Sequence, residues 1–403
     1  MNSRERFIAT VERKPVDRPA CWLGDPTPEA VPALCDYYHV DNIKELKKVC
    51  GDDFYAVEIP YKSPTCSAIF AAFDWYMNGS NVDTEHRTLT ADGCFAQCED
   101  LEDVEAVNFP WPDPELYIDP EECRRLVDEA PDDKVVMGML WACHFQDTCA
   151  AFGMQTCLMN MVAEPEMVHY VDDHIVDFYL KALKIFLEAT KGKVQAILIG
   201  DDVGSQRGLM ISPALISEFV IPGAKKLIDL AHSYGVKVVY HSCGSIVEAI
   251  PLLIEAGVDV IHPIQALAAG MDPANLKDKF DGKISFCGGV DTQDLLPNGT
   301  PELKSFVPTS RQALSYHQAM RDYSRMFRQA ISRRCLTKQP RSTNREEEKY
   351  DYYWRKNQRF HSFCCRGYCK KRCGVYQRPC KKTGRSRSNI YRLLCICSGG
   401  RGS

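Results

Sequence analysis

Short apolar runs alternate with longer stretches of helical periodicity from the start of the chain to about residue 303. Seven of the runs have the length and aliphatic composition of strands: Ala20–Gly24, Phe54–Pro60, Val135–Leu140, Gln195–Asp201, Val236–His241, Val258–Ile264 and Ile284–Gly288. The helical stretches between them include Glu164–Thr190, Ser212–Tyr234 and Ser245–Ala256. This alternation predicts a parallel sheet with helices outside it.

Two of the predicted helices carry signals at their boundaries. Ser212 can cap a helix in which Pro213 takes the first position, where the missing N–H of proline has no cost. Gly235 and Gly257 each stand between a helical stretch and the next strand, and glycine commonly ends a helix at such a place.

The expected fold class is α/β, a (β/α)8 TIM-type barrel. A length of 403 residues accommodates one barrel of roughly 250–350 residues and an additional segment. The doubly wound alternative would carry a Gly-x-Gly-x-x-Gly turn after a strand, and the sequence has none. The eighth strand should follow Thr300–Glu302, where the composition changes, so we expect an incomplete barrel with seven strands in frame.

Charge divides the chain at about residue 303. The net charge is −5, but residues 304–403 hold 25 Lys and Arg against 5 Asp and Glu, which leaves −25 for residues 1–303. Leu, Ile, Val and Phe number only 13 in residues 304–403, too few to bury a core. We therefore expect a barrel domain over 1–303 and a disordered, basic, cysteine-rich tail over 304–403.

The remaining composition is typical of a cytoplasmic globular protein. No run of apolar residues is long enough to predict a membrane span, and the polar start Met1–Arg6 has no apolar region of a secretory signal. Twenty cysteines in a chain of this length indicate buried reduced thiols, with a metal site among them, rather than a disulfide scaffold.

Polar residues follow the predicted strand ends, where barrels of this type form their active sites. A polar loop residue would explain any one of them, but their repetition at successive strand ends indicates a site for a small-molecule substrate. The candidates for substrate contact are Trp22, Asp25, Trp141, His144, Gln206, His262, Gln265 and Asp291.

Two adjacent carboxylates, Asp201 and Asp202, follow an apolar strand. They could orient a substrate or act as general acid and base, and the alternative is a cap for the next helix. We favour a catalytic role for one of the two.

The pattern His241-x-Cys243 is the most specific signal in the chain. It lies at the end of the strand Val236–His241, and residues two apart on a strand share a face. An imidazole and a thiol are ligands suited to Zn²⁺. A zinc site needs a third ligand, and Cys287 is the candidate within the chain, although we favour a small core thiol as the explanation of that residue.

Several stretches resemble the uroporphyrinogen decarboxylase superfamily: Arg4–Phe7 with Pro15–Pro19, Gly200–Gln206, His241–Gly244 and Gly288–Gln293. The resemblance covers about residues 1–303. It implies a barrel enzyme with one of two chemistries. One is the decarboxylation of uroporphyrinogen without a cofactor, and the other is methyl transfer linked to a corrinoid, with zinc held by a His-x-Cys and a later Cys.

The residues favour the methyltransferase branch, because His241 and Cys243 match its zinc motif residue for residue. The decarboxylases carry two arginines after the first strand for substrate carboxylates, and the matching segment Trp22–Pro26 has none. Arg207 is the only arginine in the strand-end loops, and a net charge of −25 would repel a polyanion. The catalytic Asp of the decarboxylases corresponds loosely to Glu58, which we retain as a catalytic candidate.

The resemblance thus implies zinc-dependent methyl transfer between a corrinoid, carried by a partner protein, and a thiol that zinc converts to a thiolate. Uroporphyrinogen decarboxylation, a step of porphyrin biosynthesis, is the first alternative. An inactive barrel remnant with a basic interaction tail is the second.

The tail has three interpretations. A zinc knuckle would need a Cys-x₂-Cys pair, which the cysteines from Cys364 to Cys397 do not form. A nucleic-acid arm would use Lys and Arg beside aromatic residues such as Tyr352 and Trp354, but we do not favour it. We favour translation out of frame, because a shifted frame through Asp322–Lys338 permits a Pro-Asp-Val-Pro-x-x-Asn-Ile-like segment that resembles the usual ending of this superfamily.

Limited proteolysis tests this interpretation of the tail. Trypsin should cut first at the many Lys and Arg of residues 304–403 and leave a core of about three hundred residues, because an unfolded segment is cleaved before a folded one. A tail that resists trypsin as well as the core does would contradict the prediction.

Overall fold

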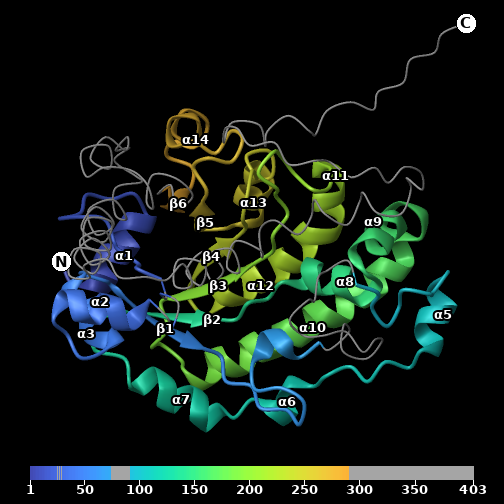
Figure 1. The fold of residues 1–403 in the computed structure, drawn as a ribbon, viewed down its shortest axis with the longest axis horizontal. Helices are drawn as coiled ribbons and strands as arrows, with labels where there is room; N and C mark the ends of the chain where they lie inside the picture. The colour runs from blue at the N-terminus through green and yellow to red at the C-terminus, as the bar shows by residue number, and fades with distance from the viewer. Residues whose placement is uncertain (25, 27, 29, 74–90, 290–403) are drawn as a thin grey trace, which may run out of the picture. The chain divides into compact units, whose positions relative to one another are not determined.

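The computed structural model describes residues 1–289 except 25, 27, 29 and 74–90. Within this part, six parallel strands form one sheet in the order of the sequence, from β1 to β6 (Figure 1). The strands are Phe54–Glu58 (β1), Val135–Met139 (β2), Ala196–Gly200 (β3), Lys237–His241 (β4), Val260–Ile264 (β5) and Ser285–Gly288 (β6). The predicted α/β class with a parallel sheet is confirmed, and over the described residues the sheet is open.

Helices surround this sheet. Those before β2 are Ser3–Val11 (α1), Val31–Tyr38 (α2), Ile43–Val49 (α3), the 3-10 helix Ile69–Ala71 (η1), Leu101–Ala106 (α5), Pro114–Tyr117 (α6) and Pro120–Asp128 (α7). Those after β2 are His144–Phe152 (α8), Met154–Ala163 (α9), Pro165–Ala189 (α10), Pro213–Leu215 (α11), the π-helix Ile216–Val220 (η3), Ile221–Ser233 (α12), Ile250–Ala256 (α13) and Pro273–Phe280 (α14). The long α10 packs along both α8 and α12.

Successive strand residues face two different cores. One set, which includes Val136, Ile197 and Tyr240, packs with the helices. The other set, which includes Met139 and Leu198, faces a second cluster that Phe7, Val11, Ala20 and Trp22 complete from the N-terminal segment. Both faces of the strands are therefore buried, as a parallel sheet requires, and the N-terminal segment covers the inner one.

The predicted first strand, Ala20–Gly24, is wrong. The Cys21 N–H donates to Asp53 Oδ2 at 2.8 Å and the Leu23 N–H to Asp52 Oδ2 at 3.3 Å, while the Cys21 carbonyl accepts the Asp53 N–H at 2.8 Å. Carboxylates thus take the N–H groups that a strand ladder would use, so the segment lies beside β1 without joining the sheet.

The boundary signals predicted from sequence are confirmed. Ser212 caps α11 with its side chain, and Pro213 begins that helix. Gly257 ends α13 in the left-handed conformation with φ 101°. The predicted eighth strand and the tail over 304–403 lie outside the described residues.

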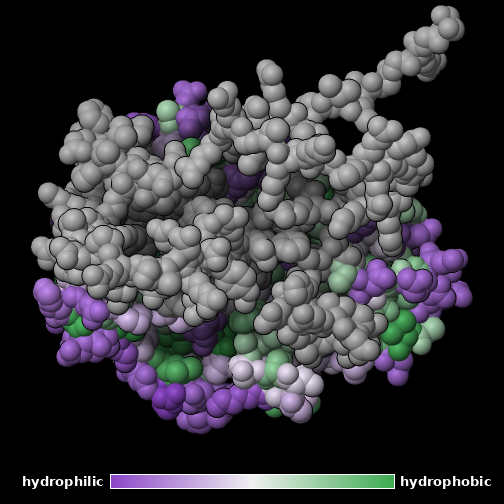
Figure 2. Space-filling view, in the orientation of Figure 1, coloured by the Kyte–Doolittle hydropathy of each residue, from purple (hydrophilic) through white to green (hydrophobic). Residues whose placement is uncertain are grey.

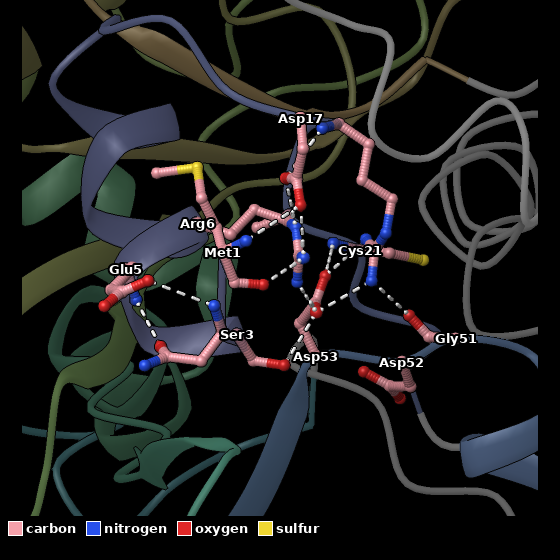
Figure 3. A network of polar contacts seen from close by, with 12 residues as sticks. Met1, Ser3, Glu5, Arg6, Asp17, Cys21, Gly51, Asp52 and Asp53 are labelled. Carbon is pink, nitrogen blue, oxygen red and sulfur yellow. Dashed lines mark hydrogen bonds and ion pairs between the residues drawn. The ribbon is translucent and has the colours of Figure 1, made fainter.

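A buried ionic network holds the N-terminal segment to the start of β1 (Figure 3). Asp53, which is 1% exposed, accepts from Ser3 Oγ at 2.8 Å and from Arg6 Nη1 at 2.7 Å. Arg18 donates to both Asp53 oxygens, at 2.6 and 2.9 Å, and Arg6 also donates to both oxygens of Asp17, at 2.8 and 2.9 Å. The segment that carries Trp22 to the inner core is therefore anchored by one buried carboxylate.

Hydrophilic side chains lie over α3, α5 and α7 on the face seen in Figure 2. These helices bury few apolar residues each, such as Leu46 in α3 and Cys123 in α7, and turn charged residues to the surface. Within the described part of the chain, no helix combines the length and the apolar character needed to cross a bilayer.

Replacement of Asp53 tests the anchoring role of this network. Asp53→Ala should lower the free energy of unfolding by about 3–5 kcal/mol, because it removes the buried carboxylate that Arg6 and Arg18 share and leaves Arg6 with Asp17 alone. Asp128→Ala, which removes an exposed ion pair with Lys193, is the control and should cost less than about 1 kcal/mol. Urea denaturation measures both, and an equal small cost would contradict the anchoring role.

Candidate metal centre

Three adjacent strands, β3, β4 and β5, bring the candidate residues together at the edge of the sheet where the carboxyl ends of the strands lie. Gly200 at the end of β3 pairs with His241 at the end of β4, and His241 pairs with His262 in β5. A Cβ at Gly200 would lie 2.0 Å from the His241 carbonyl oxygen, and its φ of 146° suits only glycine. The loops that follow β3 and β4 therefore start next to each other.

Asp202, His241 and Cys243 form a compact cluster at this edge. One ligand atom from each lies within 4.8 Å of the other two, and all three side chains are half-buried. The Cys243 Sγ and Asp202 Oδ1 atoms are each 3.5 Å from His241 Nε2. In the described part of the chain this is the group of His, Cys, Asp and Glu side chains arranged to hold a metal ion.

The spacing of this cluster fits zinc. Bonds of about 2.0–2.1 Å from zinc to nitrogen and about 2.3 Å from zinc to sulfur, at a tetrahedral angle, place the nitrogen and the sulfur roughly 3.5 Å apart. His241 Nε2 and Cys243 Sγ are separated by 3.5 Å. The Cys243 N–H donates to Asp202 Oδ1 at 2.7 Å, so the carboxylate is oriented by the residue that supplies the sulfur. Three protein ligands would leave a fourth position for a substrate.

The Cys243 thiol keeps its proton when no metal is bound. Burial raises the pKa of Cys243 well above its ordinary value, and the Asp202 carboxylate raises that pKa further. A thiol ligand must lose its proton to bind a metal ion, so metal binding at this site would release a proton.

A second imidazole lies directly behind the cluster. The Nδ1 atoms of His241 and His262 are 3.1 Å apart, and the two ring centroids are separated by 5.1 Å. Burial lowers the pKa of His262 well below its ordinary value, and the neighbouring His241 lowers that pKa further. The His262 ring also contacts Trp22, with centroids 4.9 Å apart.

Trp141 and Glu58 line the same edge. The Trp141 Nε1–H lies 3.0 Å from both carboxylate oxygens of Glu58, and its ring meets the ring of His241 edge-on at 6.1 Å. Trp141 has a positive φ of 51°, an uncommon conformation for a large side chain that turns the chain sharply after β2. The carboxylate predicted to be catalytic is therefore oriented by an indole beside the candidate ligands.

Two glutamines predicted to contact substrate also contact each other. Gln206 Nε2 donates to Gln265 Oε1 at 2.8 Å, and the Gly244 N–H donates to the same oxygen at 3.1 Å. These contacts join the loops after β3, β4 and β5. The pair therefore holds together the loops that carry Asp202 and Cys243.

The structure corrects the role predicted for His144, which is 1% exposed and has no open surface for a substrate. Its Nδ1 lies 2.7 Å from Asp172 Oδ1, and its Nε2 faces Asp201 Oδ2 at 3.5 Å without a hydrogen bond. A Cβ on Gly223 of α12 would come within 2.7 Å of the imidazole, so glycine makes room for the ring.

The buried carboxylates hold a proton on this imidazole. Burial alone would lower the pKa of His144, but Asp172 and Asp201 outweigh that effect and raise it to about 9. Burial raises the pKa of Asp201 to about 7, although His144 acts in the opposite direction. His144 is therefore a charged member of the core.

The adjacent carboxylates Asp201 and Asp202 occupy different surroundings. Asp201 is 1% exposed and accepts the Gln146 N–H at 3.1 Å, while the Gln146 side chain accepts the Asp202 N–H at 3.0 Å. Asp202 is half-buried and belongs to the cluster with His241 and Cys243. Of the two, only Asp202 is placed to act on a molecule from outside.

Other predicted residues lie elsewhere. Trp22 is 7% exposed and packs in the inner core, so it too offers little surface to a substrate. Cys287 packs against the same inner core and is not one of the three residues whose ligand atoms come together. Burial raises the pKa of Cys287 to about 12, with a further contribution from Asp52. Asp25 and Asp291 lie outside the described residues.

Sequence reasoning missed Asp172 and Gln146. Asp172 stands among Val168, Val171 and Ile175 on the buried face of α10, and a charged residue in an apolar stripe is a signal that it has a buried partner. Gln146 acts mainly through backbone groups, and nothing in the sequence points to it.

Comparisons with known proteins bear on the family and the fold of the chain. The family model described as uroporphyrinogen decarboxylase (URO-D) matches residues 2–309. Among solved structures, a methyltransferase from Methanosarcina mazei is similar, with a TM-score of 0.53 and 15% sequence identity over 82% of this chain and 99% of that chain. None of the curated proteins compared with the chain matches it.

The charge on His144 gives a prediction for stability. Its pKa is about 9 in the folded protein against 6.5 ordinarily, so its contribution is complete below about pH 6.5 and is lost as the pH rises through about 9. The free energy of unfolding should therefore fall between these pH values, and it should fall less in His144→Gln. Urea midpoints at several pH values measure the difference, and identical slopes for the two proteins would contradict the assigned charge.

Proposed function

The chain belongs to the uroporphyrinogen decarboxylase family, and from this premise we propose that it transfers a methyl group from a corrinoid to a thiol at a zinc ion held by His241 and Cys243. The observation that carries the proposal is the separation of 3.5 Å between Cys243 Sγ and His241 Nε2. Asp202 Oδ1, also 3.5 Å from that nitrogen, supplies the third ligand within the described residues.

The donor set supports zinc over magnesium and calcium. One thiolate, one imidazole and one carboxylate are all common zinc ligands, whereas magnesium and calcium prefer oxygen atoms alone. The three side chains are half-buried, so a substrate can approach the remaining position. When bound, zinc would lower the pKa of a substrate thiol so that the thiolate is present at neutral pH.

The transfer itself needs no further protein nucleophile. The sulfur of the substrate forms a bond to the methyl carbon while the bond from that carbon to cobalt breaks, and the electron pair of the broken bond stays on cobalt. The thiol proton leaves to solvent when the thiolate forms. A corrinoid carried by a partner protein would have to approach the edge where Trp141 and Glu58 lie beside His241.

The charge of this region argues against the decarboxylase alternative. Uroporphyrinogen is a polyanion, and carboxylates are best bound by arginine forks. Glu58 and Asp202 are acidic residues at the edge, and Arg207 is the arginine that the described strand-end loops contain. A small neutral or singly charged thiol suits such surroundings better than a polyanion does.

Methyl transfer by the zinc-loaded full chain tests the proposal. The protein should demethylate free methylcobalamin in the presence of thiols and form a thioether, which mass spectrometry detects. Cys243→Ser and His241→Ala should each lower the rate at least about 100-fold. Loss of a group that hydrogen-bonds a metal ligand already costs about 10–100-fold, and loss of the ligand itself should cost more. Cys98→Ser, which changes a partly buried thiol outside the cluster, should leave the rate unchanged.

Two results would contradict the proposal. The first is methyl transfer that is insensitive to both ligand replacements. The second is release of carbon dioxide from uroporphyrinogen at an ordinary enzymatic rate without methyl transfer, which would establish the decarboxylase alternative.

A further inference from the structure

We propose that His262 is a positioning residue, which accepts the Nδ1 proton of His241 and thereby presents the Nε2 lone pair of His241 to the metal ion. This inference rests on the proposed zinc site. It assigns His262, which the sequence suggested as a substrate contact, to the support of a ligand.

The contact between the two rings follows from the sheet. His241 and His262 are direct neighbours in the parallel ladder of β4 and β5, and their Nδ1 atoms are 3.1 Å apart. A neutral imidazole has one nitrogen that donates and one that accepts. Two facing Nδ1 atoms at this distance therefore share one proton, and the ring that carries it determines the tautomers of both.

Only one of the two arrangements suits a metal ion. If His241 carries the proton on Nδ1 and donates it to His262, its Nε2 lone pair faces Cys243 Sγ and Asp202 Oδ1, each at 3.5 Å. If His262 donates instead, the proton of His241 is on Nε2, where the metal ion would bind. Histidine ligands generally donate their other N–H to a neighbouring group, which fixes the tautomer and the ring orientation.

The acceptor is itself held in place. The ring of His262 packs against Trp22, with centroids 4.9 Å apart, and Trp22 in turn packs against Phe54 in the inner core. The carbonyl of His262 accepts the Ser242 N–H at 2.7 Å. A fixed acceptor costs little entropy when the ligand binds, because neither ring has to be ordered for the purpose.

Zinc affinity of the full chain, measured by competition with a chromophoric chelator, tests the inference. His262→Phe keeps an aromatic ring against Trp22 but removes the acceptor, and it should weaken zinc binding roughly 10–100-fold. His262→Asn can accept through its amide oxygen and should recover part of that loss. His232→Gln changes a histidine that pairs with Asp259 away from the cluster and should bind zinc as the wild type does.

Nitrogen-15 NMR of the imidazoles gives a second measurement on the unaltered protein. With zinc bound, His241 should show a protonated Nδ1 and a metal-bound Nε2, and its signals are assigned by their absence in His241→Ala. This result is decisive even if His262→Phe fails to fold, because it needs no replacement of His262.

The outcomes separate this inference from the proposed function. If His241→Ala abolishes zinc binding while His262→Phe binds as tightly as the wild type, or if zinc occupies Nδ1 of His241, the role of His262 is wrong and the zinc site stands. If the wild type binds no zinc, or His241→Ala binds it unchanged, the proposed function fails and the inference fails with it.

Discussion

The register of three parallel strands determines the chemistry of this protein. Gly200, His241 and His262 occupy one row across β3, β4 and β5, and neighbouring strands in a sheet lie only about 4.8 Å apart. The two imidazoles on this row must touch, and a side chain larger than that of glycine at position 200 would meet the backbone of His241. A shift of the register by one residue would move Asp202 and His262 away from His241.

Polar side chains form two sets around this row, one half-buried and one buried. The outer set, Asp202, His241 and Cys243, is half-buried and can meet a substrate. The inner set, His144 with Asp201 and Asp172, is buried, and Gln146 connects it to Asp202 through hydrogen bonds at 3.1 and 3.0 Å. The inner set gives the loop after β3 a fixed conformation, from which Asp202 extends toward the cluster.

The sequence predicted those parts of the structure that depend on local pattern. Six strands, the cap at Ser212 and the shared face of His241 and Cys243 follow from periodicity and residue type. The error at Ala20–Gly24 arose because the carboxylates of Asp52 and Asp53, about thirty residues later, take its N–H groups. The burial of His144 likewise depends on Asp172 in another helix, a contact that no local pattern contains.

X-ray absorption at the zinc edge of the zinc-loaded full chain tests the central claim most directly, because it counts the atoms around the metal. The account predicts one protein sulfur at about 2.3 Å, together with imidazole nitrogen and carboxylate oxygen at about 2.0–2.2 Å. In Cys243→Ser the sulfur signal should disappear. A spectrum with two or more protein sulfurs, or one unchanged by Cys243→Ser, would show that other cysteines hold the metal and would contradict the assignment of Asp202, His241 and Cys243.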